Sequence, residues 1–75
     1  MQISFENYPE INLRDRVAFS AIQVGARFAT DRWYWEKIDE QNARVLDGFK
    51  SNSVRLLGQV HQFHSWSVVN SVSIT

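Results

Sequence analysis

Two runs of strand-forming residues on either side of a short polar turn constrain the fold most strongly. The first run covers residues 24–30, and the second covers residues 33–38 and begins with Trp33-Tyr34-Trp35. Aromatic and β-branched side chains fit the pleated surface of a sheet, and the intervening Asp31-Arg32 is typical of a turn. The sequence therefore predicts a β-hairpin over residues 24–38.

Further short strands are predicted on both sides of this hairpin. The polar run at residues 39–42 is expected to reverse the chain, and Asp47-Gly48 marks another reversal before a loop at residues 49–53. Apolar residues that alternate with polar or small ones predict extended backbone in the remaining segments. The expected additional strands cover residues 2–5, 43–47, 54–57 and 68–74.

The segment around residues 13–22 allows two interpretations. A helix capped by Asn12 would align Leu13 and Val17 on one face. A strand at residues 16–19, followed by a tight turn, fits the alternation of apolar with small or polar residues equally well. We favour the strand, and an α+β fold with one short N-terminal helix is the alternative.

The length of 75 residues allows one small domain, which we place over residues 1–75. Five or more short strands with little room for helices predict a mostly β fold. A small barrel or rolled antiparallel sheet is favoured because closure hides sheet edges that a tiny domain cannot otherwise protect.

Charge and cysteine content limit the classes of partner and compartment. Eight basic residues balance eight acidic ones, so no overall positive field collects nucleic acid, and there is no cysteine for disulfides or thiolate metal sites. The first residues lack the pattern of a signal peptide, and no apolar run is long enough to cross a bilayer. We expect a cytoplasmic protein without a membrane partner.

A family resemblance rests on residues 19–57. The segments Val24-Gly25-Ala26-Arg27-Phe28, Trp35-Glu36-Lys37-Ile38 and Asn42-Ala43-Arg44-Val45-Leu46-Asp47-Gly48 resemble small SH3-like β-barrel proteins encoded by phages and mobile elements. The resemblance implies an SH3-like fold. It carries over no catalytic residue.

No catalytic or metal centre, and no cofactor, is predicted. His61 and His64 would point to opposite faces of a strand, whereas metal ligands must converge and usually number three or more. Acidic residues between Asp31 and Asp47 alternate with basic ones, as on a solvated, ion-paired surface. We therefore expect that the protein is not an enzyme.

The aromatic run offers a candidate binding surface. Strand alternation sends Trp33 and Trp35 to one face and Tyr34 to the other, so one set is expected to face away from the core. If the tryptophans are outside, they form an exposed stripe of the kind that marks a binding site; we slightly favour burial of Trp35. The predicted partner-binding residues are Trp33, Trp35, Arg32, Arg44 and Trp66.

The C-terminal strand offers a second candidate surface. The last 25 residues carry one charged side chain, Arg55, and an edge strand without charges invites pairing with another chain. We expect an edge-strand interface at Val68, Asn70, Val72 and Ile74, which would join a homodimer or a partner protein. In the alternative, the tail is protected inside the barrel.

Together these patterns predict a noncatalytic protein-binding module. In a phage or mobile element, such a module would block a host complex, such as a defence system. The alternative function is a small nucleic-acid-binding β-barrel, which would use arginines near the strands, among them Arg27, Arg32 and Arg44, together with Trp33. Nucleic acid is the less favoured partner because acidic residues are interleaved with these arginines.

Overall fold

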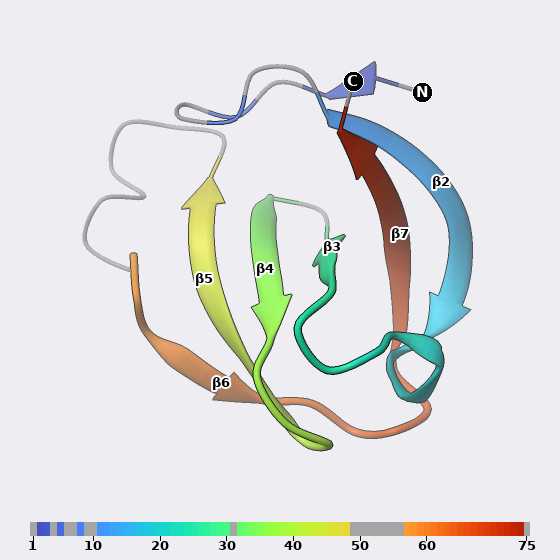
Figure 1. Cartoon of the computed structure of the whole chain (residues 1–75), viewed down its shortest axis with the longest axis vertical. Helices are drawn as coiled ribbons and strands as arrows, with labels where there is room; N and C mark the ends of the chain where they lie inside the picture. Colours follow the sequence, from blue (N-terminus) through green and yellow to red (C-terminus); the bar gives the residue numbers. More distant parts are fainter. Residues whose placement is uncertain are drawn as a thin grey trace.

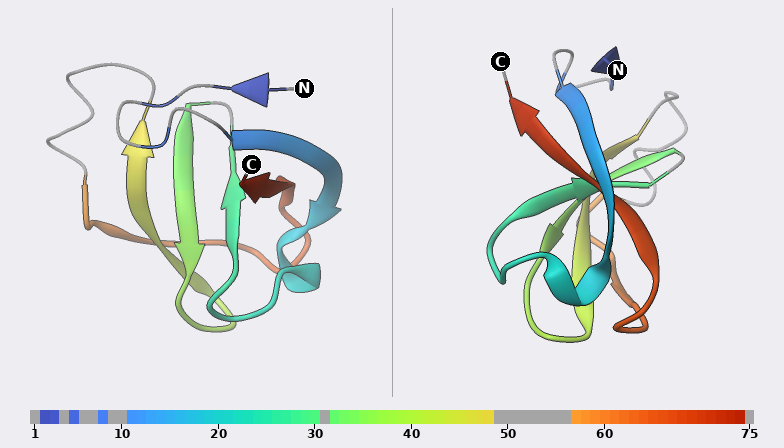
Figure 2. Two further views of the ribbon diagram at one scale, coloured as in Figure 1. Left: turned by 45° about the horizontal axis from the view of Figure 1, so that its top comes forward. Right: turned by 90° about the vertical axis from the view of Figure 1, so that its right-hand side faces the viewer.

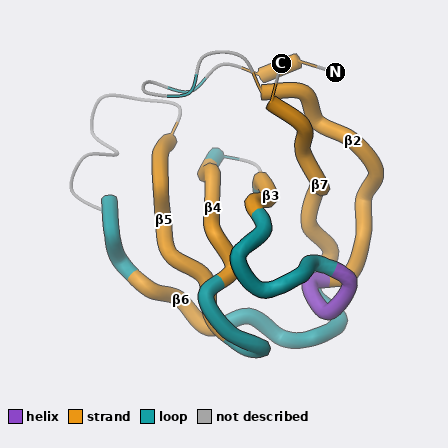
Figure 3. The backbone as a smooth tube through the Cα atoms, viewed as in Figure 1, coloured by secondary structure: helices purple, strands orange, loops and turns teal. Residues whose placement is uncertain are grey.

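The computed structural model describes residues 2–3, 5, 8, 11–30, 32–48 and 57–74. These residues form β-strands and one short 3-10 helix, η1, as Figures 1 and 3 show. The elements are β1 (Gln2–Ile3), β2 (Ile11–Ala18), η1 (Phe19–Ala21), β3 (Arg27–Ala29), β4 (Trp33–Lys37), β5 (Asn42–Gly48), β6 (Val60–Gln62) and β7 (Val68–Ile74). The prediction of a mostly β fold with five or more short strands is confirmed.

The seven strands among the described residues form one antiparallel sheet in the order β1-β2-β7-β3-β4-β5-β6. The last strand of the chain therefore lies inside the sheet, between β2 and β3. The sheet is strongly curved (Figure 2), and the connection from β6 to β7 runs along its lower end in the view of Figure 1. This connection meets η1, because Phe19 N donates to the Ser67 carbonyl (2.7 Å) and Ser20 N donates to the Ser65 carbonyl (3.0 Å).

The helical alternative for residues 13–22 is wrong. This segment continues β2 as far as Ala18 and then makes the three-residue turn η1. The strand is favoured because β2 pairs with β7 from Ile11 opposite Ile74 to Ala18 opposite Val68, with one irregularity between Leu13 and Arg16. Long-range pairing thus overrides the weak helical pattern.

The predicted hairpin is confirmed, although its first strand is shorter than expected. Phe28 pairs with Trp35 across β3 and β4. Residues 24–26 lie outside β3 because a turn precedes the strand: Ala26 N donates to the Gln23 carbonyl at 2.9 Å, and Gly25 has a φ of 92°. A positive φ favours glycine, so Gly25 marks the turn, and β3 begins only after it.

The other predicted segments are described in part. β5 extends beyond residues 43–47 at both ends, and the turn before it is held by Asp39, whose carboxylate accepts from the backbone N–H groups of Gln41 and Asn42 at 2.8 Å each. These hydrogen bonds lower the pKa of Asp39. The expected loop at residues 49–53 and most of the expected strand at 54–57 lie outside the described residues, while Leu57 is in a turn.

The sheet is packed on both faces, so the expectation that one face of β4 points away from the core is wrong. Tyr34 and Trp35 are neighbours with 0% and 7% of their surface exposed. Trp35 belongs to a first cluster on one face, and Tyr34 belongs to a second cluster that includes Phe5 on the other. The second face is buried because Phe5 and Tyr8 cover it, with their rings against that of Tyr34.

No helix in the described part of the chain is long and apolar enough to cross a membrane.

Candidate functional site

An open hollow lies where β3 separates from β7. Ala29 opposite Asn70 is the last pair between these strands, and the next residue, Thr30, turns back by donating from its N–H to the Trp33 carbonyl at 3.0 Å. The turn leaves an open pocket of about 610 Å³ beside the start of β7. Its lining residues are Arg16, Ala29, Thr30, Arg32, Trp33, Val68, Val69 and Asn70.

Two arginines give this pocket a positive charge. Arg16 lies on β2 opposite Asn70, whereas Arg32 precedes β4, so β7 brings together two residues that are remote in sequence. Both side chains are exposed, and neither forms an ion pair with a described residue. Since the described lining includes no acidic side chain, the pocket is suited to an anion.

The wall of the pocket is anchored to the core. Trp33 is half-buried and packs against the first core cluster. Thr30 Oγ1 accepts a hydrogen bond of 2.9 Å from Trp35 Nε1, and Trp35 in turn stacks on Phe28 with ring centroids 6.1 Å apart. These contacts hold Trp33 and Thr30 in place in the absence of a ligand, which lowers the entropic cost of binding one.

An exposed tryptophan lies near the pocket. Trp66 is 71% exposed, and its ring stacks on His64 with 4.8 Å between centroids and 3° between planes. A hydrogen bond from Ser67 N to the His64 carbonyl closes this bend. Because Trp66 is two residues before Val68, which lines the pocket, their Cα atoms are at most about 7 Å apart.

The structure separates the five predicted partner-binding residues. Arg32 and Trp33 line the pocket, and Trp66 is exposed nearby. Trp35 is a core residue, so the alternative of an exposed stripe of Trp33 and Trp35 is wrong. The favoured alternative, in which Trp35 is buried, agrees with the structure. Arg44 lies on β5 and forms an ion pair of 3.9 Å with Glu36.

The placement of residues 68–74 at a sheet edge is wrong. β7 pairs with β2 on one side and with β3 on the other, as in the alternative of a protected tail. Its predicted interface residues divide accordingly: Val68 and Asn70 line the pocket, and Val72 packs against the second core cluster. Ile74 ends β7 opposite Ile11 and is therefore also within the paired part of the strand.

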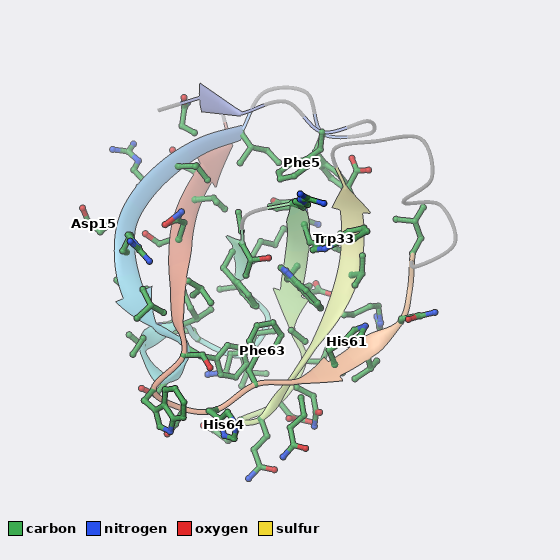
Figure 4. The ribbon with its side chains drawn as sticks, turned by 180° about the vertical axis from the view of Figure 1, so that it is seen from behind. Phe5, Asp15, Trp33, His61, Phe63 and His64 are labelled. Atoms are coloured by element: carbon green, nitrogen blue, oxygen red, sulfur yellow. The ribbon has the colours of Figure 1, made fainter. Side chains whose placement is uncertain are left out.

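The two histidines lie apart, His61 on β6 and His64 on the connection from β6 to β7 (Figure 4). His61 is exposed with its ring edge-on to Trp35, at 5.4 Å between centroids, whereas His64 stacks on Trp66. Between them, Phe63 points inward and contacts Phe19 and Phe28. The described residues contain no group of three potential metal ligands.

Sequence reasoning missed Arg16 and the role of Asn70 in the pocket. The pairing of β2 with β7 places them side by side, and no local pattern in the sequence signals that pairing. Lys37, one of the basic residues between Asp31 and Asp47 that were expected on a solvated surface, is buried, with 1% of its surface exposed. Alternation of apolar and polar residues predicts a strand, but whether each face of that strand is buried depends on which other residues pack against it.

Comparisons with protein-family models, with curated proteins and with solved structures find no match to this chain.

Proposed function

We propose that this protein is a noncatalytic protein-binding module. Its recognition surface consists of the pocket lined by Arg16, Arg32, Trp33 and Val68, together with the exposed Trp66 two residues before Val68; we call it the Arg-Trp surface. The observation that carries the proposal is the presence of two arginines without a described ion-pair partner in one open pocket, next to a tryptophan that is 71% exposed.

The composition of this surface supports a binding role. Arginine and tryptophan are the side chains that most often dominate the energy of protein interfaces. Val68, which lines the pocket and lies two residues after Trp66 in the chain, is a second exposed apolar side chain, with 57% of its surface accessible. In a domain of this size, burial of such side chains by a partner removes apolar surface from water while the arginines select an acidic group.

A protein partner is favoured over nucleic acid by the distribution of charge. Lys37 is buried and Arg44 is paired with Glu36, so two of the cations that a nucleic-acid surface would use are not available as free charges. The chain as a whole has no net charge. One local pocket fits an acidic side chain of a protein better than a track of successive phosphates.

The resemblance to SH3-like proteins of phages and mobile elements supports a specific context for this module. In that context, the protein would act as an inhibitor that occupies a surface of a host complex, such as a defence system. The Arg-Trp surface would then supply the contacts with that complex. This mode of action requires no catalytic residue.

The test is a selection of random-sequence peptides on the immobilised full chain, followed by calorimetric titration of the enriched peptides. We expect acidic peptides whose affinity falls about tenfold or more in Arg32→Gln and in Trp66→Ser, because hot-spot residues contribute at least ~1.4 kcal/mol each. Arg44→Gln is the matched control, since it removes the same charge elsewhere on the sheet. Equal losses in Arg32→Gln and Arg44→Gln, or no enrichment, would overturn the proposal.

Two further measurements distinguish other partners. Light scattering that shows a dimer disrupted by Trp66→Ser would assign the surface to a second copy of this chain. Tight binding of single-stranded oligothymidine that weakens steeply with salt would assign it to nucleic acid. Either result would replace the partner protein proposed here.

A further inference from the structure

We infer that the pocket between β2, β7 and the β3–β4 turn binds a phosphomonoester, as carried by a phosphorylated side chain. The inference rests on the proposed function for the nature of the partner, a protein, but the recognition of the phosphoryl group follows from the pocket itself. Its elements are two guanidinium groups, two neutral hydrogen-bonding side chains and an apolar wall.

Charge matching favours a phosphoryl group. Arg16 and Arg32 bring two positive charges to one pocket that has no acidic side chain in its described lining. A phosphomonoester carries a charge of about −1.5 to −2 at neutral pH, whereas a carboxylate or a phosphodiester carries −1. A doubly charged ligand therefore neutralises both arginines, whereas a singly charged ligand leaves one cation without a counter-charge.

Hydrogen-bond geometry supports the same ligand. Each planar guanidinium can donate two parallel hydrogen bonds to a pair of oxygens, and a phosphomonoester offers three terminal oxygens. Asn70 and Thr30 line the same pocket with an amide and a hydroxyl group. Thr30 Oγ1 already accepts from Trp35 Nε1, which leaves its own hydrogen to donate to a ligand oxygen.

The size and apolar side of the pocket indicate how the phosphate is presented. A volume of about 610 Å³ lies within the range of pockets for small organic ligands and exceeds the needs of a free phosphate ion. Trp33, Val68 and Val69 supply apolar surface against which the carbon part of a phosphorylated side chain can pack. This wall distinguishes an organic phosphomonoester from inorganic phosphate.

The test is an NMR titration of the ¹⁵N-labelled full chain with phenyl phosphate, using phenyl sulfate and benzoate as singly charged counterparts. We expect shifts at Arg32, Trp33 and Asn70, and an affinity for phenyl phosphate about tenfold above that for either monoanion, because a second charge-assisted pair forms. Arg16→Gln and Arg32→Gln should each weaken phenyl phosphate about tenfold, to the level of the monoanions, whereas Arg44→Gln should not. The same spectra report whether each variant is folded.

Equal affinities for the three compounds, or shifts that do not involve the pocket, would overturn the inference.

The results also distinguish failure of this inference from failure of the proposed function. Selected peptides without phosphate that depend on Arg32 and Trp66, combined with equal affinities in the titration, would retain the protein-binding module and reject phosphate recognition. Preferred binding of phenyl phosphate without any peptide binding would retain the phosphomonoester site and reject the partner class. Oligothymidine that displaces phenyl phosphate at low concentration would instead identify a nucleic-acid backbone as the ligand.

Discussion

The Nζ atom of Lys37 donates a hydrogen bond of 2.8 Å to the carbonyl oxygen of Ile22, inside the core of the sheet. The same nitrogen donates to the Phe19 carbonyl at 3.0 Å and lies 4.3 Å from the centroid of the Phe19 ring. β4 thereby fixes η1, which supports the connection from β6 to β7. A lysine side chain that is 1% exposed thus has a structural role.

We predict that Lys37→Met lowers the free energy of unfolding by about 2–4 kcal/mol, because the buried Ile22 carbonyl loses its side-chain partner while the apolar volume is largely kept. Urea denaturation followed by far-UV circular dichroism measures the change. Arg44→Met is the control, since Arg44 is exposed on the neighbouring strand. Equal stability of Lys37→Met and the unmodified chain would show that the hydrogen bonds from Nζ contribute nothing.

A second prediction separates two tryptophans that the sequence assigns to one binding surface. Trp35→Ala should lower the unfolding free energy by about 3–5 kcal/mol, because it empties a core position that is 7% exposed. Trp66→Ala should change it by no more than about 0.5 kcal/mol, because that side chain is 71% exposed. Thermal melts monitored by circular dichroism test both. A comparable loss in Trp66→Ala would mean that its stack on His64 is part of the core.

The hairpin and the C-terminal strand could be predicted because their signals are local. Alternating apolar residues and a polar turn specify the hairpin within residues 24–38 and the strand at residues 68–74 whatever lies beside them. The burial of Trp35 could be anticipated because a small domain needs large core residues. What surrounds each strand is a matter of long-range pairing, which these patterns do not encode.

The pocket could not be predicted in full because it depends on the position of β7. The C-terminal segment lacks charged residues, which is compatible with an edge strand and with a central one; the structure places it between β2 and β3. Only this arrangement brings Arg16 beside Asn70 and opens a hollow toward Arg32. Likewise, both faces of β4 are buried because Phe5 and Tyr8 cover Tyr34, a contact between distant parts of the chain.

A third prediction concerns the hydroxyl group of Tyr34. This oxygen is buried and has no hydrogen-bond partner of good geometry among the described residues, although the Arg27 guanidinium lies 5.9 Å from the ring centroid. Tyr34→Phe should therefore leave the unfolding free energy unchanged or raise it by up to ~1 kcal/mol, because the phenol loses hydration on folding without gaining a full partner. A loss of more than 1 kcal/mol in urea denaturation would show that Arg27 or water supplies that partner.

The same substitution has an expected pH dependence. Burial raises the pKa of Tyr34, and the nearby Arg27 guanidinium only partly offsets this. Because the unfolded chain deprotonates first, the contribution of Tyr34 to stability is complete below about pH 10 and is lost as the pH rises through the folded-state pKa. Unfolding free energies measured on either side of this pH should fall less steeply in Tyr34→Phe. Identical slopes for the two proteins would contradict the raised pKa.

A fourth prediction concerns the attachment of the N-terminal segment to the sheet. The carboxylate of Asp47, a residue with 0% of its surface exposed, accepts a 3.0 Å hydrogen bond from Tyr8 N and a 2.8 Å hydrogen bond from Gly48 N. Asp47→Ala removes both acceptors, so we expect the unfolding free energy to fall by about 1–3 kcal/mol. The amide of Tyr8 should also exchange its hydrogen faster, which NMR measures directly.

A second readout of this substitution is the Tyr34 ring. Because Tyr8 packs on Tyr34 at 4.9 Å between ring centroids, the Tyr34 ring signals should shift as the second core cluster loosens. The internal control is the amide of Val45 on β5, which donates to the carbonyl of Gln59, the residue before β6. Equal acceleration there would indicate global destabilisation and not release of Tyr8 from Asp47.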